Sequence, residues 1–276
     1  MSSNDMKWIL AILWIIVILI IVFHQRVPKK WRPTSVEEAA KICESTDGVP
    51  KVIWTFWDNE PSDLIKMCIN SWAQWNPDYR IVVLNKSTVP EYHGVDSVQR
   101  LSDYVRVDFL SRYGGVWSDA SIKMNAPLPQ YEGFHGYYQE SVTTNPKFPV
   151  IESWFFACPK NHPFVNKWKD KFFEVQTVGA DKFVNSVKND GVDTQKIENH
   201  QYLAIYIAAQ HVLQKYGPFH MNLKKAEDGP FRHSINNGWN AKKSVDSLMH
   251  DQPEMIKFIG AERAVGIPDE IFGYYS

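Results

Sequence analysis

The sequence lacks the short motifs that mark several large enzyme classes. It contains no C-x-x-C pair, no H-E-x-x-H, no Walker loop and no G-x-S-x-G, and no part of it repeats. These absences exclude the usual zinc sites, the metalloproteases, the P-loop enzymes and the α/β hydrolases. The function must therefore be sought in a different pattern of residues.

Cysteine and net charge are also scarce. The three cysteines, Cys43, Cys68 and Cys158, form no even set, so we expect no disulfide framework. With 30 Lys and Arg against 31 Asp and Glu, the formal net charge is -1. Because a basic bias is missing, we expect no nucleic acid partner. The 276 residues, 44% of them hydrophobic, are enough to bury one sizeable core.

One long apolar run is present near the N-terminus. Residues 8–23 read WILAILWIIVILIIVF, roughly sixteen residues against the ~20 that usually span a bilayer. No small-residue cleavage site follows, so we expect an uncleaved anchor rather than a signal peptide, and a single-pass membrane protein. Because most basic residues follow the run, the positive-inside rule favours the cytosolic face for the rest of the chain. A luminal, Golgi-type orientation is the alternative.

These features divide the chain into four parts. A short tail (residues 1–7) is followed by the anchor (residues 8–23) and by a basic stem (residues 24–48). The stem carries a short polar helix, expected at residues 35–44. Residues 49–276 form the one large domain.

The most informative segment is residues 101–128, LSDYVRVDFLSRYGGVWSDASIKMNAPL. Apolar residues recur at helical intervals as far as Tyr113, and Gly114 then supplies the residue type that usually ends such a helix. A short strand is expected from Val116. Asp119 should therefore lie near the carboxyl end of a strand, which is where open α/β sheets bind their ligands.

The residue types in this segment suit the transfer of a sugar from a nucleotide. The diphosphate of such a donor gains negative charge as the glycosidic bond breaks, so the enzyme must supply cations. Asp119 is suited to hold a divalent ion, and Arg106 offers a fork of donors to phosphate oxygens. Asp103 lies one helical turn before Arg106. Gly115 has no side chain, so the backbone beside Asp119 can approach a nucleotide closely.

Three ordered segments resemble one protein family. Residues 102–121, SDYVRVDFLSRYGGVWSDAS, resemble the signature of the capsular polysaccharide synthesis proteins and of the related glycosyltransferase family 32. Residues 49–85 resemble the opening strand, helix and second strand of that family, and residues 152–172 resemble its next block. The resemblance implies an α/β fold of the GT-A type, a nucleotide-sugar-binding domain with a mixed central sheet. It also implies hexose transfer with retention of the anomeric configuration.

The family's DxD motif is altered in this chain, where it reads Asp119-Ala120-Ser121. The resemblance implies Asp119 as the ligand of Mn²⁺ or Mg²⁺, Ser121 as a weak ligand or a hydrogen bond to the diphosphate, and Asp103 as a ribose or sugar contact. Serine is a neutral and weaker ligand than the carboxylate these ions prefer, so metal dependence stays an open question.

Two tryptophans near the first strand are candidates for the nucleotide base. In similar enzymes an aromatic residue after this strand stacks on the base of the donor, and Trp57 matches that position better than Trp54. Alternation along a strand sends the two side chains to opposite faces, so one of them should be buried in the core.

The sequence thus predicts a membrane-anchored glycosyltransferase. It would move a hexose from a UDP- or GDP-sugar to a surface, capsular or other glycan or glycolipid. A mannosyltransferase that uses GDP-mannose is one alternative. Another is a non-catalytic scaffold of a glycan-assembly complex, which the missing second carboxylate motivates. Taken singly, Asp103 and Arg106 also fit an ordinary helix ion pair, and Asp119 a turn cap.

Overall fold

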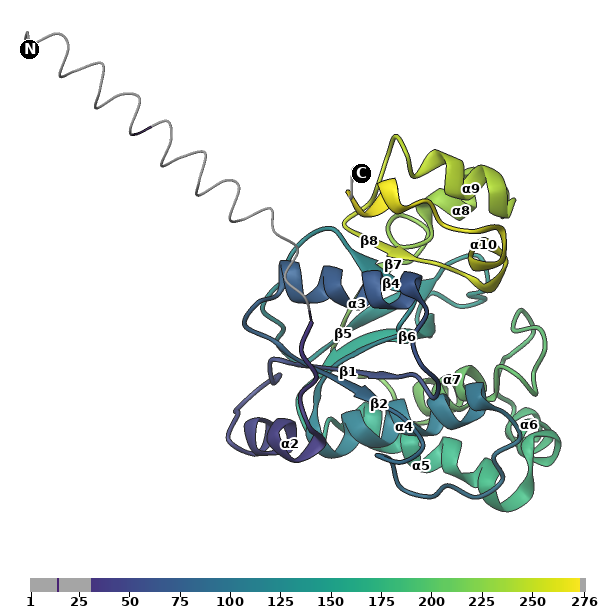
Figure 1. Cartoon of the computed structure of the whole chain (residues 1–276). Helices are drawn as coiled ribbons and strands as arrows, with labels where there is room; N and C mark the ends of the chain where they lie inside the picture. The colour runs from purple at the N-terminus through teal and green to yellow at the C-terminus, as the bar shows by residue number, and fades with distance from the viewer. Residues whose placement is uncertain (1–13, 15–30, 274–276) are drawn as a thin grey trace, which may run out of the picture.

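The structure, a computed structural model, describes Trp14 and residues 31–273 and is built around a mixed sheet (Figure 1). The strands of its six-stranded sheet lie in the order β2-β1-β3-β6-β5-β7. β1 is parallel to β2 and β3, β6 is antiparallel to β3 and β5, and β7 is parallel to β5. The predicted α/β fold with a mixed central sheet is confirmed. The bounds are β1 (Val52–Phe56), β2 (Arg80–Leu84), β3 (Gly115–Ser118), β5 (Phe134–Gln139), β6 (Val150–Cys158) and β7 (Met221–Lys225).

Helices cover both faces of this sheet (Figure 1). α3 packs on one face, and α4, α5 and α7 pack on the other. Side chains of β1 alternate accordingly: Trp54 joins the core beneath α4, whereas Ile53 joins the core beneath α3. The helices are α2 (Val36–Glu44), α3 (Asp63–Trp75), α4 (Val98–Tyr113), α5 (Pro163–Val178), α6 (Ala180–Asn189) and α7 (Ala204–Tyr216).

The C-terminal segment forms a smaller layer against α3. Its strand β8 pairs antiparallel with β4, which follows β3 directly in the chain. Ile256 and Phe258 from this layer pack around Cys68 of α3 in a small core of their own. The elements are β4 (Ile122–Met124), α8 (Arg232–Asn236), α9 (Ala241–Ser247), β8 (Met255–Lys257), α10 (Gly260–Val265) and the 3₁₀ helix η1 (Asp269–Phe272).

The stem helix agrees with its prediction. α2 begins after Ser35, whose hydroxyl oxygen accepts a hydrogen bond from the backbone N–H of Glu38. Such a cap satisfies one of the donors that the first turn leaves free. Ala39 and Cys43 form the buried side of α2.

The membrane anchor predicted at residues 8–23 requires correction. No helix in the described part of the chain is both long and apolar enough to cross a membrane. Apart from Trp14, the predicted anchor and the tail at residues 1–7 lie outside the described residues. The predicted single-pass localisation, with either orientation of the large domain, is not supported.

The glycine pair after α4 lets β3 lie close to β1. Gly114 ends α4 with φ +66°, and Gly115 follows with φ +95°, a backbone region that side chains disfavour. A Cβ atom on Gly115 would lie 2.7 Å from the backbone oxygen of Val52 and 3.2 Å from Nε1 of Trp54. β1 therefore occupies the space beside Gly115. Close packing of the two strands explains the glycine, and no bound ligand is needed to explain it.

We expect Gly115→Ala to be strongly destabilising. Gly48→Ala is the matched control, because Gly48 has φ +92° with no atom within 4 Å of an added Cβ. The control should lose about 1 kcal/mol from backbone strain alone. Gly115→Ala should lose at least about 3 kcal/mol, because the clash with β1 adds to that strain. Urea unfolding of both variants measures the difference, and equal losses would contradict the packing argument.

Candidate active site

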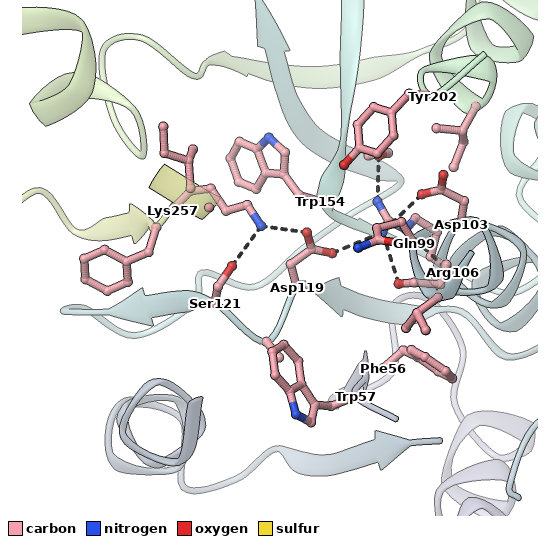
Figure 2. Close-up of a pocket in the computed structure, with 18 of the residues that line it drawn as sticks. Phe56, Trp57, Gln99, Asp103, Arg106, Asp119, Ser121, Trp154, Tyr202 and Lys257 are labelled. Atoms are coloured by element: carbon pink, nitrogen blue, oxygen red, sulfur yellow. Dashed lines mark hydrogen bonds and ion pairs between the residues drawn. The ribbon is translucent and has the colours of Figure 1, made fainter. Parts of the chain in front are cut away.

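A cavity opens at the carboxyl ends of β1 and β3 (Figure 2). Its volume is about 580 Å³, within the usual range for a small-molecule site. Its lining comes from the end of β1 and the residues after it, from α4, from the turn between β3 and β4, from β6, from the start of α7 and from β8 with α10. Segments far apart in the sequence therefore meet at one edge of the sheet.

Five of the seven residues predicted for the site line this cavity. Figure 2 shows them around one opening, with Trp57 and Phe56 toward the bottom of the view and Ser121 next to Lys257. The structure thus brings together residues from the end of β1, from α4 and from the turn after β3. The five are Trp57, Asp103, Arg106, Asp119 and Ser121.

The other two predicted residues, Trp54 and Gly115, lie in the core instead. Trp54 is fully buried, its Nε1 donates to the backbone oxygen of Gly114 at 3.0 Å, and its ring meets Phe109 edge to face. Gly115 packs against β1, as described above. Neither residue lines the cavity. Strand alternation correctly places one of the two tryptophans in the core, and that one is Trp54.

Arg106 of α4 is held in place by several contacts at the centre of the site. Its Nη1 donates to the hydroxyl of Ser153 at 2.7 Å, and its Nη2 donates to the hydroxyl of Ser102 at 3.2 Å. The same Nη2 lies 3.2 Å from Oδ1 of Asp103. The guanidinium also stacks over the ring of Trp117, 5.3 Å from its centroid. A buried arginine with this many partners has a fixed orientation.

Asp119 is also enclosed by donors. Its Oδ1 accepts from Nε1 of Trp117 at 3.0 Å and lies 3.4 Å from Nη2 of Arg106, and its Oδ2 accepts from Lys257 at 2.6 Å. The backbone N–H of Asp119 donates to the oxygen of Trp154. Burial raises the pKa of this carboxyl, but the two cations and their hydrogen bonds outweigh that effect and hold it below its ordinary value. Asp119 is therefore ionised at neutral pH.

Asp103 differs from Asp119 in its electrostatics. Burial raises its pKa to about 6, because the nearby guanidinium of Arg106 offsets only part of the loss of hydration. Asp119 adds to this rise through its like charge. Asp103 and Asp119 both lie near Arg106, but the pKa of Asp103 is raised and the pKa of Asp119 is lowered.

Lys257, at the end of β8, is a site residue that the sequence did not reveal. Its Nζ donates to Asp119 and, at 3.0 Å, to the hydroxyl oxygen of Ser121. Burial lowers the pKa of this ammonium group, and Asp119 offsets part of the effect. Lys257 lies in a three-residue strand of a turn-rich region with no motif around it. Only its pairing with β4 brings it to the cavity.

The residues present do not fit a divalent cation held by Asp119 and Ser121. Both oxygens of Asp119 already accept hydrogen bonds, and an ammonium group bridges Asp119 to Ser121. In the part of the chain that the structure describes, no group of three or more His, Cys, Asp or Glu side chains could hold a metal ion.

A buried acid lies beneath the cavity. Glu152 of β6 is 3% exposed, and its Oε2 accepts a hydrogen bond from the hydroxyl of Tyr206 at 2.8 Å. Tyr206 itself lines the cavity. Burial raises the pKa of Glu152 to about 7, because the hydrogen bonds to its ionised form compensate only partly for lost hydration.

The chain was compared with known proteins. The family model of the capsular polysaccharide synthesis protein matches residues 24–250. Among solved structures, the chain is similar to the PaToxG glycosyltransferase, with 14% identity, a TM-score of 0.40, and coverage of 86% of this chain and 95% of that one. It is also similar to a glycosyltransferase involved in the glycosylation of the major capsid of PBCV-1, with 9% identity, a TM-score of 0.42, and coverage of 80% and 96%. No match was found among curated proteins.

We expect Glu152→Gln to change how stability depends on pH. A carboxyl whose pKa rises from 4.5 to about 7 on folding stabilises the protein fully below pH 4.5, and this contribution is lost as pH rises through 7. At about 1.4 kcal/mol per pKa unit, the loss is on the order of 3 kcal/mol. Between pH 5 and pH 8, the unfolding free energy should therefore decrease more for the native chain than for Glu152→Gln. Glu91→Gln, at an exposed position, serves as the control. Parallel curves for Glu152→Gln and the native chain would contradict the argument.

Proposed function

The chain belongs to the capsular polysaccharide synthesis protein family, and we propose that it is a glycosyltransferase that moves a hexose from a nucleotide diphosphate sugar to a glycan acceptor. The observation that carries the proposal is the cluster of Asp103, Arg106 and Asp119 in one cavity at the carboxyl ends of β1 and β3. Open α/β sheets bind ligands at such strand ends. A fixed arginine in a partly enclosed cavity is suited to a phosphate group.

The donor would lie along the length of this cavity. Trp57, beside the end of β1, would stack on the uracil or guanine base, because every base offers a π-face to an aromatic ring. Arg106 would contact the diphosphate through its fork of donors, and Ser121 would add a hydrogen bond. Asp103 would accept hydrogen bonds from ribose or sugar hydroxyls. The donor is a UDP- or GDP-sugar, and a GDP-mannose-dependent mannosyltransferase belongs to the same proposal.

Retention of configuration is part of the proposal, without a covalent intermediate. Asp58, Asp103 and Asp119, which line the cavity, are each within ion-pair distance of a lysine or an arginine. A carboxylate engaged in this way is a poor nucleophile. The acceptor hydroxyl would attack C1 on the face from which the phosphate leaves. The C1–O bond to phosphate would break, and the hydroxyl proton would pass to a phosphate oxygen.

The acceptor would enter at the open side of the cavity. Tyr202 lies there with 56% of its surface exposed, and Trp154 lines the wall nearby (Figure 2). The exposed ring of Tyr202 offers a flat apolar surface to a sugar ring while its hydroxyl stays hydrated, whereas Trp154 is only 4% exposed. We therefore assign the acceptor, a surface, capsular or other glycan or glycolipid, to this side.

A second candidate is a non-catalytic scaffold that binds a nucleotide or glycan within a glycan-assembly complex. The observation in its favour is Ser121, which replaces the second carboxylate of the DxD motif. Asp119→Asn separates the two functions. An enzyme would lose turnover in this variant, whereas a scaffold would keep its assembled partners and the glycan product of the cell.

Arg106→Lys should abolish most of the transferase activity. Lysine keeps the charge but not the planar fork, so we expect turnover to fall about 100-fold or more. Arg112→Lys is the matched control on the same helix, because Arg112 pairs with Asp108 and does not line the cavity. Nucleotide release from a panel of UDP- and GDP-sugars measures the effect. Release that survives in Arg106→Lys, or that no donor supports in the native chain, would contradict the proposal.

Trp57→Ala should weaken nucleotide binding by about tenfold, the usual effect of losing one base–aromatic stack. Trp57→Phe should retain most of the affinity. Trp75→Ala is the control, because Trp75 is 41% exposed on α3 and does not line the cavity. Calorimetric titration with UDP and GDP gives the affinities. Equal binding by Trp57→Ala and the native chain would exclude Trp57 as the base platform.

A further inference from the structure

We propose that Lys257 takes the place of a divalent cation, so that the chain binds the diphosphate of its donor without a metal. This inference rests on the proposed function, because it names the cation that a nucleotide sugar would meet in the same cavity. Its basis is the position of the ammonium group between the first and third residues of Asp119-Ala120-Ser121.

The ammonium group lies where the altered motif would otherwise hold an ion. Nζ of Lys257 is 2.6 Å from Oδ2 of Asp119 and 3.0 Å from the hydroxyl of Ser121 (Figure 2). These are the two side chains that a metal would need to share. Serine accepts a hydrogen bond from an ammonium group well but is a weak ligand for a hard cation. The replacement of a carboxylate by Ser121 therefore suits a lysine better than a metal.

The backbone holds Lys257 in this position. β8 pairs with β4, with Lys257 opposite Ile122, and the N–H of Phe258 donates to the oxygen of Ser121 at 3.1 Å. The lysine side chain is only 12% exposed. The strand pairing thus aligns the altered motif with a cation from the far end of the chain.

The charges of the site would repel an additional metal ion. Asp119 lies within ion-pair distance of Lys257 and of Arg106, which also pairs with Asp103, so the charge of Asp119 is already engaged by two cations. A divalent ion at this carboxylate would lie within a few ångströms of both cations, and like charges at that distance repel each other. An incoming diphosphate, by contrast, would meet two fixed donors.

A third cation lines the same wall. Arg263 of α10 is exposed at the cavity and makes no ion pair within the described residues. The preceding residue, Glu262, is fully buried and anchors α10, because its carboxylate accepts from Ser234 at 2.6 Å and from the backbone N–H of Ile259. Arg263 thus adds a positive charge near Lys257 for the diphosphate.

Calorimetric titration of the full chain with UDP and GDP tests the inference, in buffers that contain either EDTA or Mn²⁺. The native chain should bind one of the two nucleotides with the same affinity in both buffers. Lys257→Met should lose about 10- to 100-fold in affinity in EDTA, the usual effect of losing a charge-assisted hydrogen bond. Lys257→Arg, which keeps a cation, should retain most of the affinity.

Lys123→Met is the matched control for the loss of a buried lysine. Lys123 lies on β4 of the same two-stranded sheet, opposite Ile256, and its ammonium group contacts Asn125 and Gln252 away from the cavity. This variant should bind nucleotide as the native chain does. Thermal melts of both methionine variants show whether a loss of binding reflects unfolding.

A double variant tests the inference without relying on the folding of Lys257→Met. Ser121→Asp with Lys257→Ala removes the ammonium group and restores two carboxylates at the motif. Its nucleotide affinity should rise about tenfold or more when Mn²⁺ replaces EDTA, because paired carboxylates and phosphate oxygens suit that ion. If Mn²⁺ does not change the nucleotide affinity of the double variant, the proposal that Lys257 replaces a divalent cation is contradicted.

The outcomes separate this inference from the proposed function. If the native chain binds UDP or GDP only with Mn²⁺, or if Lys257→Met binds as tightly as the native chain in EDTA, the inference fails and the transferase proposal stands. If the native chain binds neither nucleotide in either buffer, both fail.

Discussion

The site depends on one chain of charges, in which Asp103 and Arg106 are buried and Asp119 and Lys257 are half-buried. Each cation lies within ion-pair distance of at least one carboxylate, and Arg106 lies between two of them. Removing one member of a buried pair is strongly destabilising, by about 3–5 kcal/mol in comparable cases, because the other charge is left uncompensated. The four residues come from α4, the turn after β3, and β8, so the same contacts that orient the site also join the C-terminal layer to the sheet.

The fold explains why these charges meet. β1 and β3 are parallel neighbours, so their carboxyl ends open at one edge, and the glycine pair lets β3 approach β1 closely. β4 follows within a few residues and recruits β8, which completes the far wall.

Local signals made part of the site predictable. The end of α4 at Gly114 and the position of Asp119 after a strand follow from short-range patterns, the donor chemistry pointed to Arg106, and the family resemblance implied a sugar or ribose contact for Asp103. Packing between distant segments decided the rest. Trp54 is buried because its strand alternates beneath α4, and the space beside Gly115 is taken by β1. Lys257 is separated from Asp119 by 138 positions, and no pattern around it indicates that pairing.

The most direct test is an experimental structure of the full chain with bound UDP or GDP in the presence of EDTA. We predict that the diphosphate contacts Arg106 and Lys257, that the base lies against Trp57, and that Asp119 keeps its contact with Lys257. A nucleotide bound outside this cavity, or one whose diphosphate contacts neither cation, would contradict the account.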